Sequence, residues 1–232
     1  MVNKSWLKSI AGTTVANDSR KFLSKQSKHD IALVKDIIKE VNSMGYCISY
    51  IDQLREMDKN DICLIPVVIK YIGKFDNFEV EWALITALGV RGFVDATDFL
   101  LKEFRRPNSS PVKLPDMAWN WTRRALTSAS LLKIRDANRA GDYVELIENF
   151  DTHDDCVWIV ELLGNIKYEK AYSVIVALLN DNNVSLQSSA LRALGKYKNH
   201  PETIPLIEPF TKSKNSALKE YAKKSIAKLS KN

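Results

Sequence analysis

Residues 178–195 read LLNDNNVSLQSSALRALG, which is an apolar helix end, a polar turn and a second helix that closes on Ala-Leu-Gly. Asn and Asp fill the turn, and both are residues that break a helix readily. Two helices joined by so short a turn pack side by side, so the segment predicts a helical hairpin.

Four pentapeptides repeat the end of this segment along the chain. They are ITALG at 85–89, VELLG at 160–164, LRALG at 191–195 and the degenerate KKSIA at 223–227. The last three endpoints, at positions 164, 195 and 227, are almost evenly spaced. A fixed period of this size is typical of stacked helical hairpins, so it predicts a solenoid rather than one closed core.

Two columns of apolar residues stand at fixed distances before these endpoints. The columns are four residues apart, which places both on one helical face, and we expect that face to pack against the neighbouring hairpin. The column five residues before the endpoint holds Leu84, Ile159, Ala190 and Ala222, and the column one residue before it holds Leu88, Leu163, Leu194 and Ile226.

In these features the chain resembles HEAT-repeat proteins, especially the bacterial kind with short repeats that also occurs in phycobilin lyases. The resemblance implies an all-α, right-handed superhelix of about five or six helical hairpins. In that family the second helix often begins with an Arg that forms a polar ladder. This sequence departs from the pattern, because eight residues before the endpoints stand Glu81, Cys156, Gln187 and Lys219.

We expect a single domain over 1–232, because a solenoid lengthens by adding repeats. Residues 61–232 hold the HEAT-like repeats, 31–60 a divergent hairpin, and 1–30 a basic segment that is expected to be partly flexible. Amphipathic helices are expected before the first clear repeat at Ile31–Met44, Ile48–Met57 and Ile62–Ile72.

The interval between Gly89 and Gly164 is longer than two periods, so it holds a further hairpin and an insertion. The insertion is expected at 105–116, where RRPNSSPVKLPD carries three prolines among other turn formers. Long irregular insertions of this kind are common places for function.

The second helix of the further hairpin is expected at Trp121–Ile134. The resemblance then puts Arg123 in the family's Arg position. Leu126 and Leu131 fill the apolar columns in this alignment.

The composition favours a cytoplasmic protein without a membrane partner. No stretch reaches the ~18 apolar residues of a membrane span, and 1–30 lacks a continuous apolar segment of signal-peptide length. Cys47, Cys63 and Cys156 are odd in number and lie in or beside apolar runs. This pattern favours reduced thiols packed in the core.

The formal net charge of +6 is concentrated at the two ends of the chain. Residues 1–30 carry a net +4 and 212–232 a net +6, which leaves −4 for the segment 31–211 between them. A nucleic-acid-binding domain instead carries positive charge along the surface that faces the groove. The terminal lysines are therefore interpreted as the solvated face of a capping helix, with phosphate binding as the alternative.

Motifs for catalysis and for metal binding are absent from the sequence. It holds no phosphate-binding Gly-Lys-Ser/Thr loop, no His-Glu-x-x-His helix and no Gly-x-Ser-x-Gly elbow. His153 and Cys156 have the spacing of two zinc ligands, but no second pair completes a site. We therefore expect no enzyme activity, cofactor, metal or small-molecule substrate.

The segment WNWTRR at 119–124 joins aromatic rings to guanidinium groups. That pairing stacks on nucleic-acid bases or anchors a protein interface. The alternative is that one tryptophan fills the junction beside the insertion.

Three functions remain open from the sequence. The first is a module that holds a protein partner on the concave face, as an adaptor, a regulator or a toxin-neutralising protein. The second is nucleic-acid binding or DNA repair, because the build resembles the HEAT-like alkylpurine DNA glycosylases. Asp116, Trp119 and Trp121 supply that family's residue types but not its order or spacing. The third is a bilin lyase, for which no pocket is evident.

We favour the first function. Exposed side chains of successive second helices would then contact the partner, which is a protein more readily than a nucleic acid. The residues expected to make these contacts are Glu81, Trp119, Arg123, Arg124, Glu161 and Arg192.

Overall fold

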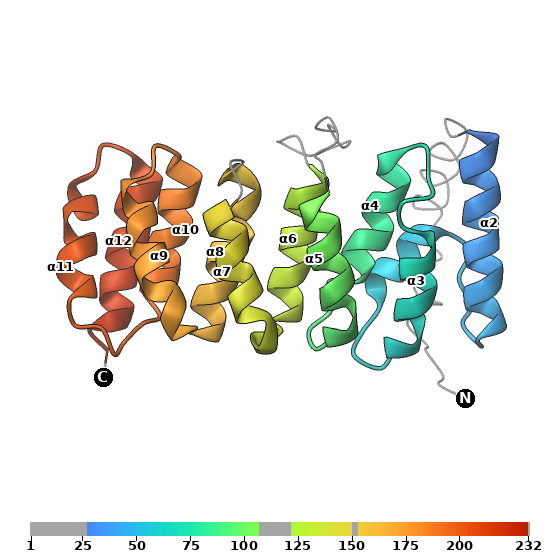
Figure 1. Ribbon diagram of the computed structural model, residues 1–232, viewed down its shortest axis with the longest axis horizontal. Coiled ribbons are helices and arrows are strands. Elements are labelled where there is room, and N and C mark those ends of the chain that lie inside the picture. Colours follow the sequence, from blue (N-terminus) through green and yellow to red (C-terminus); the bar gives the residue numbers. More distant parts are fainter. Residues whose placement is uncertain (1–26, 107–121, 150–152, 232) are drawn as a thin grey trace.

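The computed structural model describes residues 27–106, 122–149 and 153–231. In these residues the chain is a single row of packed helices, and they contain no strand (Figure 1). The predicted all-α solenoid is confirmed.

Each repeat is a hairpin of a first helix and a second helix, and the described residues hold five such hairpins in sequence. The first helices are α3 (Ile65–Tyr71), α5 (Thr97–Arg105), α7 (Ala140–Asn149), α9 (Tyr172–Ala177) and α11 (Thr203–Ile207). The second helices are α4 (Phe78–Ala87), α6 (Arg123–Ile134), α8 (Val157–Ile166), α10 (Val184–Leu194) and α12 (Ser216–Leu229).

Short 3-10 turns join onto many of these helices. Four of them lead into first helices: η3 (Ile62–Leu64), η4 (Val94–Ala96), η5 (Ala137–Arg139) and η7 (Glu169–Ala171). Two extend first helices, η8 (Leu178–Asn180) and η9 (Glu208–Lys212), and η6 (His153–Cys156) leads into α8. Side-chain caps begin the second helices α10 and α12, where Asn183 and Asn215 each accept two backbone N–H bonds.

A divergent pair precedes the repeats, formed by α2 (Lys28–Ser43) and η2 (Ile51–Glu56). The prediction of an amphipathic helix over Ile48–Met57 is wrong, because η2 is a short 3-10 helix. The Gln53 side chain accepts hydrogen bonds from the backbone N–H groups of Ser49 and Tyr50, at 2.7 and 3.2 Å, and so holds a tight loop there. The element nevertheless packs against α4 in the place of a second helix.

The second helices pack against one another in chain order, from α4 to α12. Both apolar columns predicted from the sequence lie at these contacts. All of their residues are buried except Ile226 near the end of the row, which is half-buried. The repeat signal in the sequence is therefore the contact surface between successive hairpins.

The glycines that end the repeats are the points of closest approach. Gly89 lies against Ser130, Gly164 against Ala193 and Gly195 against Ser225, so each glycine meets a small residue of the next second helix. The two serines also donate hydrogen bonds from Oγ to backbone carbonyls of the preceding helix, Ser130 to Ile85 at 2.9 Å and Ser225 to Leu191 at 2.7 Å.

These contacts correct the alignment of the inserted hairpin. Ala193 and Ser225 each stand two positions before the endpoint of their repeat, so Ser130 places this endpoint at Leu132, one period before Gly164. Leu131 keeps its column, but Thr127 rather than Leu126 stands in the other one. Both are buried, because the helix face that packs is broad enough to include them.

Helix α6 begins later than the sequence predicted. It starts at Arg123 and is capped by Thr122, whose Oγ1 accepts a hydrogen bond from the N–H of Ala125 at 2.9 Å. The corrected alignment also moves the family's Arg position from Arg123 to Arg124. Helix α5 ends at Arg105, where the predicted insertion begins, and most of the insertion lies outside the described residues.

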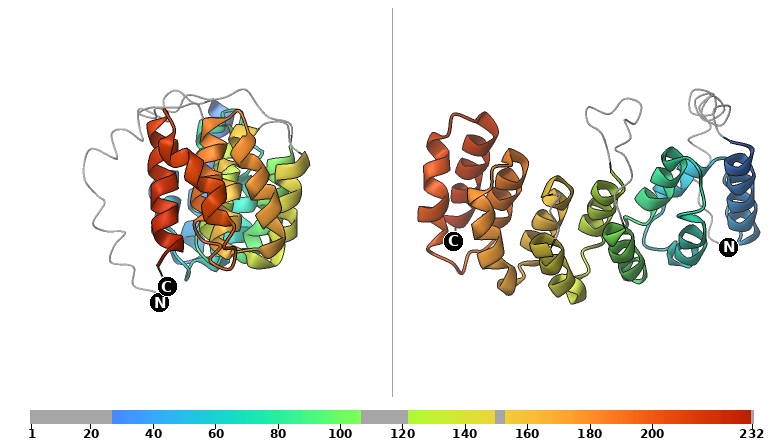
Figure 2. Two further views of the ribbon diagram at one scale, coloured as in Figure 1. Left: turned by 90° about the vertical axis from the view of Figure 1, so that its left-hand side faces the viewer. Right: turned by 45° about the horizontal axis from the view of Figure 1, so that its top comes forward.

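The row of hairpins bends. In the right-hand view of Figure 2 the first helices α5, α7 and α9 lie on the outer side of the bend, and the second helices lie on its inner side. Of the described helices, none is both long enough and apolar enough to cross a membrane.

The cysteine prediction is correct for one residue. Cys156 is buried, but Cys47 and Cys63 are exposed. Cys47 lies in the loop after α2, and Cys63 lies on η3, of which only Leu64 is buried.

Candidate partner-binding face

The inner face of the row is formed by the second helices, on the side that no neighbouring helix covers. Each second helix packs against its own first helix and against the second helices before and after it. Side chains of its middle turns that remain partly exposed therefore point to the fourth, inner side. Five of the six predicted contact residues stand on second helices, and the structure assigns most of them an internal role.

Glu81 and Arg123 form a buried ion pair between α4 and α6. The Glu81 side chain is 1% exposed and that of Arg123 is 15% exposed. Arg123 also lies 3.3 Å from the carboxylate of Glu103, which is fully buried on α5. The expectation that Glu81 is an exposed contact is wrong, because packing of three helices closes over its carboxylate. Arg123 is half-buried, so its role as a contact stays a prediction.

A second arginine shares the buried carboxylate of this cluster. Arg106 Nη1 lies 3.2 Å from Glu103 Oε2, and Arg106 is the last residue described on the α5 side of the insertion. Burial raises the pKa of Glu103, while Arg106 and Arg123 act in the opposite direction. The cluster therefore joins the structure on both sides of the insertion.

Arg124 joins the two helices on either side of the insertion. Its Nε donates to the carbonyl of Phe104 at 2.9 Å and its Nη2 donates to the carbonyl of Arg106 at 3.0 Å. These bonds tie the start of α6 to the end of α5. Arg124 is half-buried, so it too serves mainly as an internal link.

Glu161 and Arg192 form an ion pair across the inner face between α8 and α10. They occupy the same repeat position, three residues before Gly164 and Gly195. Glu161 is 15% and Arg192 33% exposed, so this pair remains accessible at the surface. The Arg192 guanidinium also lies 5.0 Å from the ring centroid of Tyr221 on α12.

Aromatic rings beside guanidinium groups recur along this face. At the other end of the row the guanidinium of Arg55 lies 4.3 Å from the ring centroid of Trp82. Both Trp82 and Tyr221 are half-buried, as is Trp158, which has on α8 the repeat position that Tyr221 has on α12. We call Arg55, Trp82, Trp158, Glu161, Arg192 and Tyr221 the inner-face set.

The sequence analysis missed most of this set. A weak signal was available, because Trp158 and Tyr221 both stand six residues before a repeat endpoint. No pattern in the sequence predicts that Arg55 stacks on Trp82, because Arg55 lies in a turn outside the repeats and Trp82 lies within one. Trp119 was expected in the binding face and Asp116 and Trp121 in the DNA-repair alternative; all three lie outside the described residues.

The described residues contain one group with the donor set for a metal ion, formed by His29, Asp30 and Asp76. Its donor atoms already have structural partners. Both oxygens of buried Asp30 accept backbone N–H bonds, from Asp76 and Asn77, and His29 Nε2 bonds to the carbonyl of Lys74 at 3.0 Å. The group therefore fastens α2 to the turn before α4.

The pair of His153 and Cys156, which has the spacing of zinc ligands, includes a poorly reactive thiol. Burial raises the pKa of Cys156 to about 12, and its Sγ lies 3.7 Å from the carbonyl of Leu146. A thiol with so high a pKa is neither a ready metal ligand nor a nucleophile. The side chain of His153 lies outside the described set.

Comparison with solved structures shows the same architecture. The chain is similar to the complex of CpcE and CpcF of phycocyanin lyase from Nostoc sp. PCC7120, with a TM-score of 0.56 and 17% identity over 72% of this chain and 65% of that chain. The fold is a HEAT- and armadillo-like helical repeat. At this level of identity the likeness concerns the fold alone, and the chain spans only 65% of the lyase chain's length.

Two engineered proteins have a similar build. One is a designed armadillo repeat protein in complex with the peptide (KR)4, with a TM-score of 0.51 and 14% identity over 77% of this chain and 90% of that chain. The other is an engineered protein with a TM-score of 0.52 and 14% identity, over 77% and 87% of the two chains. No protein-family model matches the sequence, and no match was found among curated proteins.

Proposed function

We propose that this protein is a non-enzymatic scaffold that binds a protein partner along its inner face, in an adaptor, regulatory or toxin-neutralising role. The observation that carries the proposal is the inner-face set, in which half-buried aromatic rings lie beside guanidinium groups on helices at both ends of the row. Aromatic and Arg side chains dominate the binding energy of protein interfaces.

The build of the face supports a protein partner. The rings are held by rigid helices, and their stacking on arginines fixes their orientation before binding, which lowers the entropic cost of association. Two of the similar structures are themselves complexes, one with a peptide and one of CpcE with CpcF. Catalysis is not part of this proposal, because the inner-face set holds no nucleophile beside a general base.

The proposal is tested by affinity capture from the native host's lysate with the full-length chain, with and without nuclease. The test variant is Trp82→Ala with Tyr221→Ala. The control variant is Val94→Ala with Leu206→Ala, which removes exposed apolar side chains from the elements of the first-helix layer. Circular dichroism checks that both variants keep the helical fold.

We expect one stoichiometric protein that survives nuclease, is lost with the inner-face variant and is retained by the control. Retention by the inner-face variant would contradict the proposed face. Capture that depends on nucleic acid would contradict a protein partner and would favour the repair-like alternative.

A further inference from the structure

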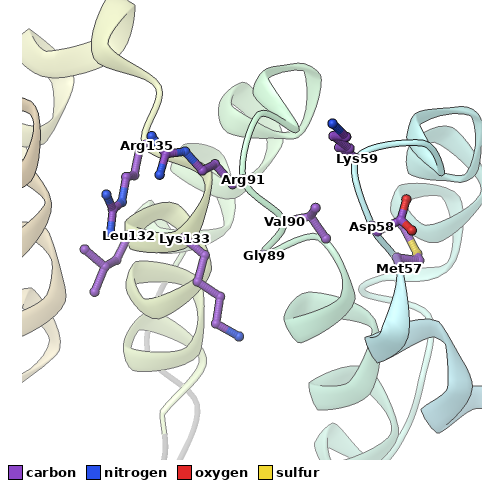
Figure 3. A pocket seen from close by; sticks show the side chains of 9 residues that line it. All are labelled: Met57, Asp58, Lys59, Gly89, Val90, Arg91, Leu132, Lys133 and Arg135. Atoms are coloured by element: carbon purple, nitrogen blue, oxygen red, sulfur yellow. The ribbon is translucent and has the colours of Figure 1, made fainter.

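A shallow, largely open depression of about 820 Å³, here called the cavity, lies at the edge of the row where second helices end, away from the inner face. Three turns form its walls: Met57, Asp58 and Lys59 follow η2, Gly89, Val90 and Arg91 follow α4, and Leu132, Lys133 and Arg135 end α6 (Figure 3). The end of α5 and the start of α6 lie at the opposite edge of the row.

The cavity combines an apolar floor with a cationic rim. Met57, Val90 and Leu132 supply aliphatic surface. The rim holds four cations and one acid, Asp58, whose Oδ1 already accepts the N–H of Asn60 at 2.7 Å. The cations are Lys59, Arg91, Lys133 and Arg135.

None of these four cations forms an ion pair with a carboxylate of the described residues. Three arginines elsewhere differ in this respect, since Arg105, Arg123 and Arg192 each pair with a Glu or Asp side chain. Helix C-termini attract cations, which explains part of the clustering. It does not explain four cations around one cavity, because like charges at close range repel.

The walls are fixed by local structure. Arg135 ends α6 in the left-handed region at φ 59°, which only a few per cent of non-glycine residues adopt, and its N–H bonds to the carbonyl of Leu131 at 3.1 Å. The N–H of Gly92 bonds to the carbonyl of Ile134 at 3.2 Å and joins two of the turns. The aliphatic part of the Lys133 side chain lies close to the backbone of Gly89.

The positive charge continues along the same edge. Lys167, Lys196 and Lys228 stand at the ends of α8, α10 and α12. Burial lowers the pKa of Lys196, and the nearby cations Lys228 and Arg135 add to this lowering. These lysines extend the row of cations beyond the cavity, although Glu169 and Glu202 stand in the turns that follow α8 and α10.

The geometry points to a binding site for an acidic protein segment that places one aliphatic or aromatic side chain on the apolar floor, between carboxylates that pair with Arg91, Lys133 and Arg135. Arg forms bidentate pairs with carboxylates, and a floor of aliphatic side chains takes an apolar anchor. A nucleic acid fits less well, because no aromatic ring lines the cavity for bases to stack on.

Neither the first 26 residues nor the segment 107–121 supplies such a segment. Residues 1–26 carry Asp18 against five Lys and Arg, and 107–121 carry Asp116 and Lys113. We therefore take an acidic run of a partner protein as the proposed occupant. This site is separate from the inner-face set, so its test leaves the proposed function untouched.

The experiment uses the full chain and a fluorescein-labelled peptide of four glutamates, a leucine and four further glutamates, followed by fluorescence anisotropy. Three comparison probes are the same peptide with lysines for glutamates, the same peptide with serine for leucine, and a labelled single-stranded DNA. We expect the acidic leucine peptide to bind best and its affinity to fall as ionic strength rises.

The test variant is R91E with K133E and R135E, and a milder version changes the same three residues to Gln. The matched control is K212E with K214E and K219E, which changes the net charge equally on exposed lysines far along the row. We expect the test variants to weaken peptide binding about tenfold or more, and the control to stay within about twofold. Leu132→Asn should abolish the preference for leucine over serine.

Equal weakening by the control would show that binding depends only on net charge and would overturn the site. Tighter binding of DNA that depends on the same three residues would overturn the choice of an acidic peptide. No binding of the acidic peptide to the folded wild-type chain would overturn the proposal altogether.

Discussion

Gly164 of α8 lies so close to Ala193 of α10 that a Cβ on Gly164 would stand 2.6 Å from the Cα of Ala193 and 2.7 Å from its Cβ. These atoms belong to helix backbone and to a methyl group, so no flexible side chain can move aside. The glycine is therefore required by the spacing of two consecutive repeats rather than by its backbone conformation.

Gly164→Ala is expected to destabilise the protein by about 1–3 kcal/mol, because the extra methyl forces two packed helices apart. The control is Gly141→Ala on α7, where a Cβ would meet nothing within 4 Å and where alanine is the better helix former. Urea unfolding followed by circular dichroism measures both. A Gly164→Ala protein as stable as the Gly141→Ala protein would contradict the close packing of α8 on α10.

Arg123→Ala is expected to destabilise the protein by about 3 kcal/mol, because it leaves the carboxylates of Glu81 and Glu103 buried together without their shared cation. Lys224→Ala is the control, since Lys224 pairs with Glu220 on the open surface of α12 and its loss should leave the melting temperature unchanged. Thermal unfolding compares the two.

A stable Arg123→Ala protein would show that the buried cluster is not needed. The expected result also limits how partner binding can be tested. Charge reversal at Arg123 or Arg124 would disturb the base of the insertion, so lost binding there would not identify a contact surface.

The sequence predicted the repeats well because their period is carried by small residues at contact points. Gly164 and Gly195 mark in the sequence the points where successive helices come closest. In the inserted hairpin Leu132 stands in the place of this glycine, so the alignment predicted for that hairpin was shifted by one residue. Burial of Glu81 was missed because its partner Arg123 is distant in the sequence and meets it only after the helices stack. The cavity was missed for the same reason, since its walls come from three separate turns.

His200 links the last two repeats through two carboxylates and a ring. Its Nδ1 lies 2.7 Å from Glu202, its Nε2 contacts Glu169, and its ring stacks on Tyr172 at 3.7 Å between centroids. The hydrogen bond to Glu202, followed by that to Glu169, raises the pKa of His200 above 6.5. The same contact lowers the pKa of Glu202 below 4.5.

This link is expected to stabilise the protein only in a window of pH. The contribution of His200 is complete below 6.5 and is lost as the pH rises through the raised pKa of the folded protein. The contribution of Glu202 is complete above 4.5 and is lost as the pH falls through its lowered pKa. The melting temperature should therefore fall from pH ~6 to pH ~8.5 in the wild type.

His200→Gln should reduce that fall, because glutamine does not titrate but can still form hydrogen bonds at this position. Hydrogen exchange of α11 amides gives a local measure, since repeats at the end of a solenoid open first. If the melting temperature of His200→Gln depends on pH as in the wild type, other titrating groups cause that dependence.

Ser225→Ala tests how much the serine hydrogen bonds between successive second helices add to the stability that the glycine contacts provide. Ser225 is buried and donates to the carbonyl of Leu191, which also accepts the N–H of Gly195 at 3.2 Å. That carbonyl therefore keeps one partner in the variant, and alanine already fills the equivalent place at Ala193. We expect a loss of about 1 kcal/mol from the missing hydrogen bond.

Ser225→Val also removes the hydroxyl, but it adds bulk where a Cβ on Gly195 would already stand 2.7 Å from the Cβ of Ser225. It should therefore cost clearly more than Ser225→Ala in urea unfolding, by about 1–3 kcal/mol of overpacking in addition to the lost bond. Equal costs would mean that the helices α10 and α12 can separate freely. Because α12 ends the row and has a neighbour on one side only, that result would limit the rigid part of the solenoid to the repeats before it.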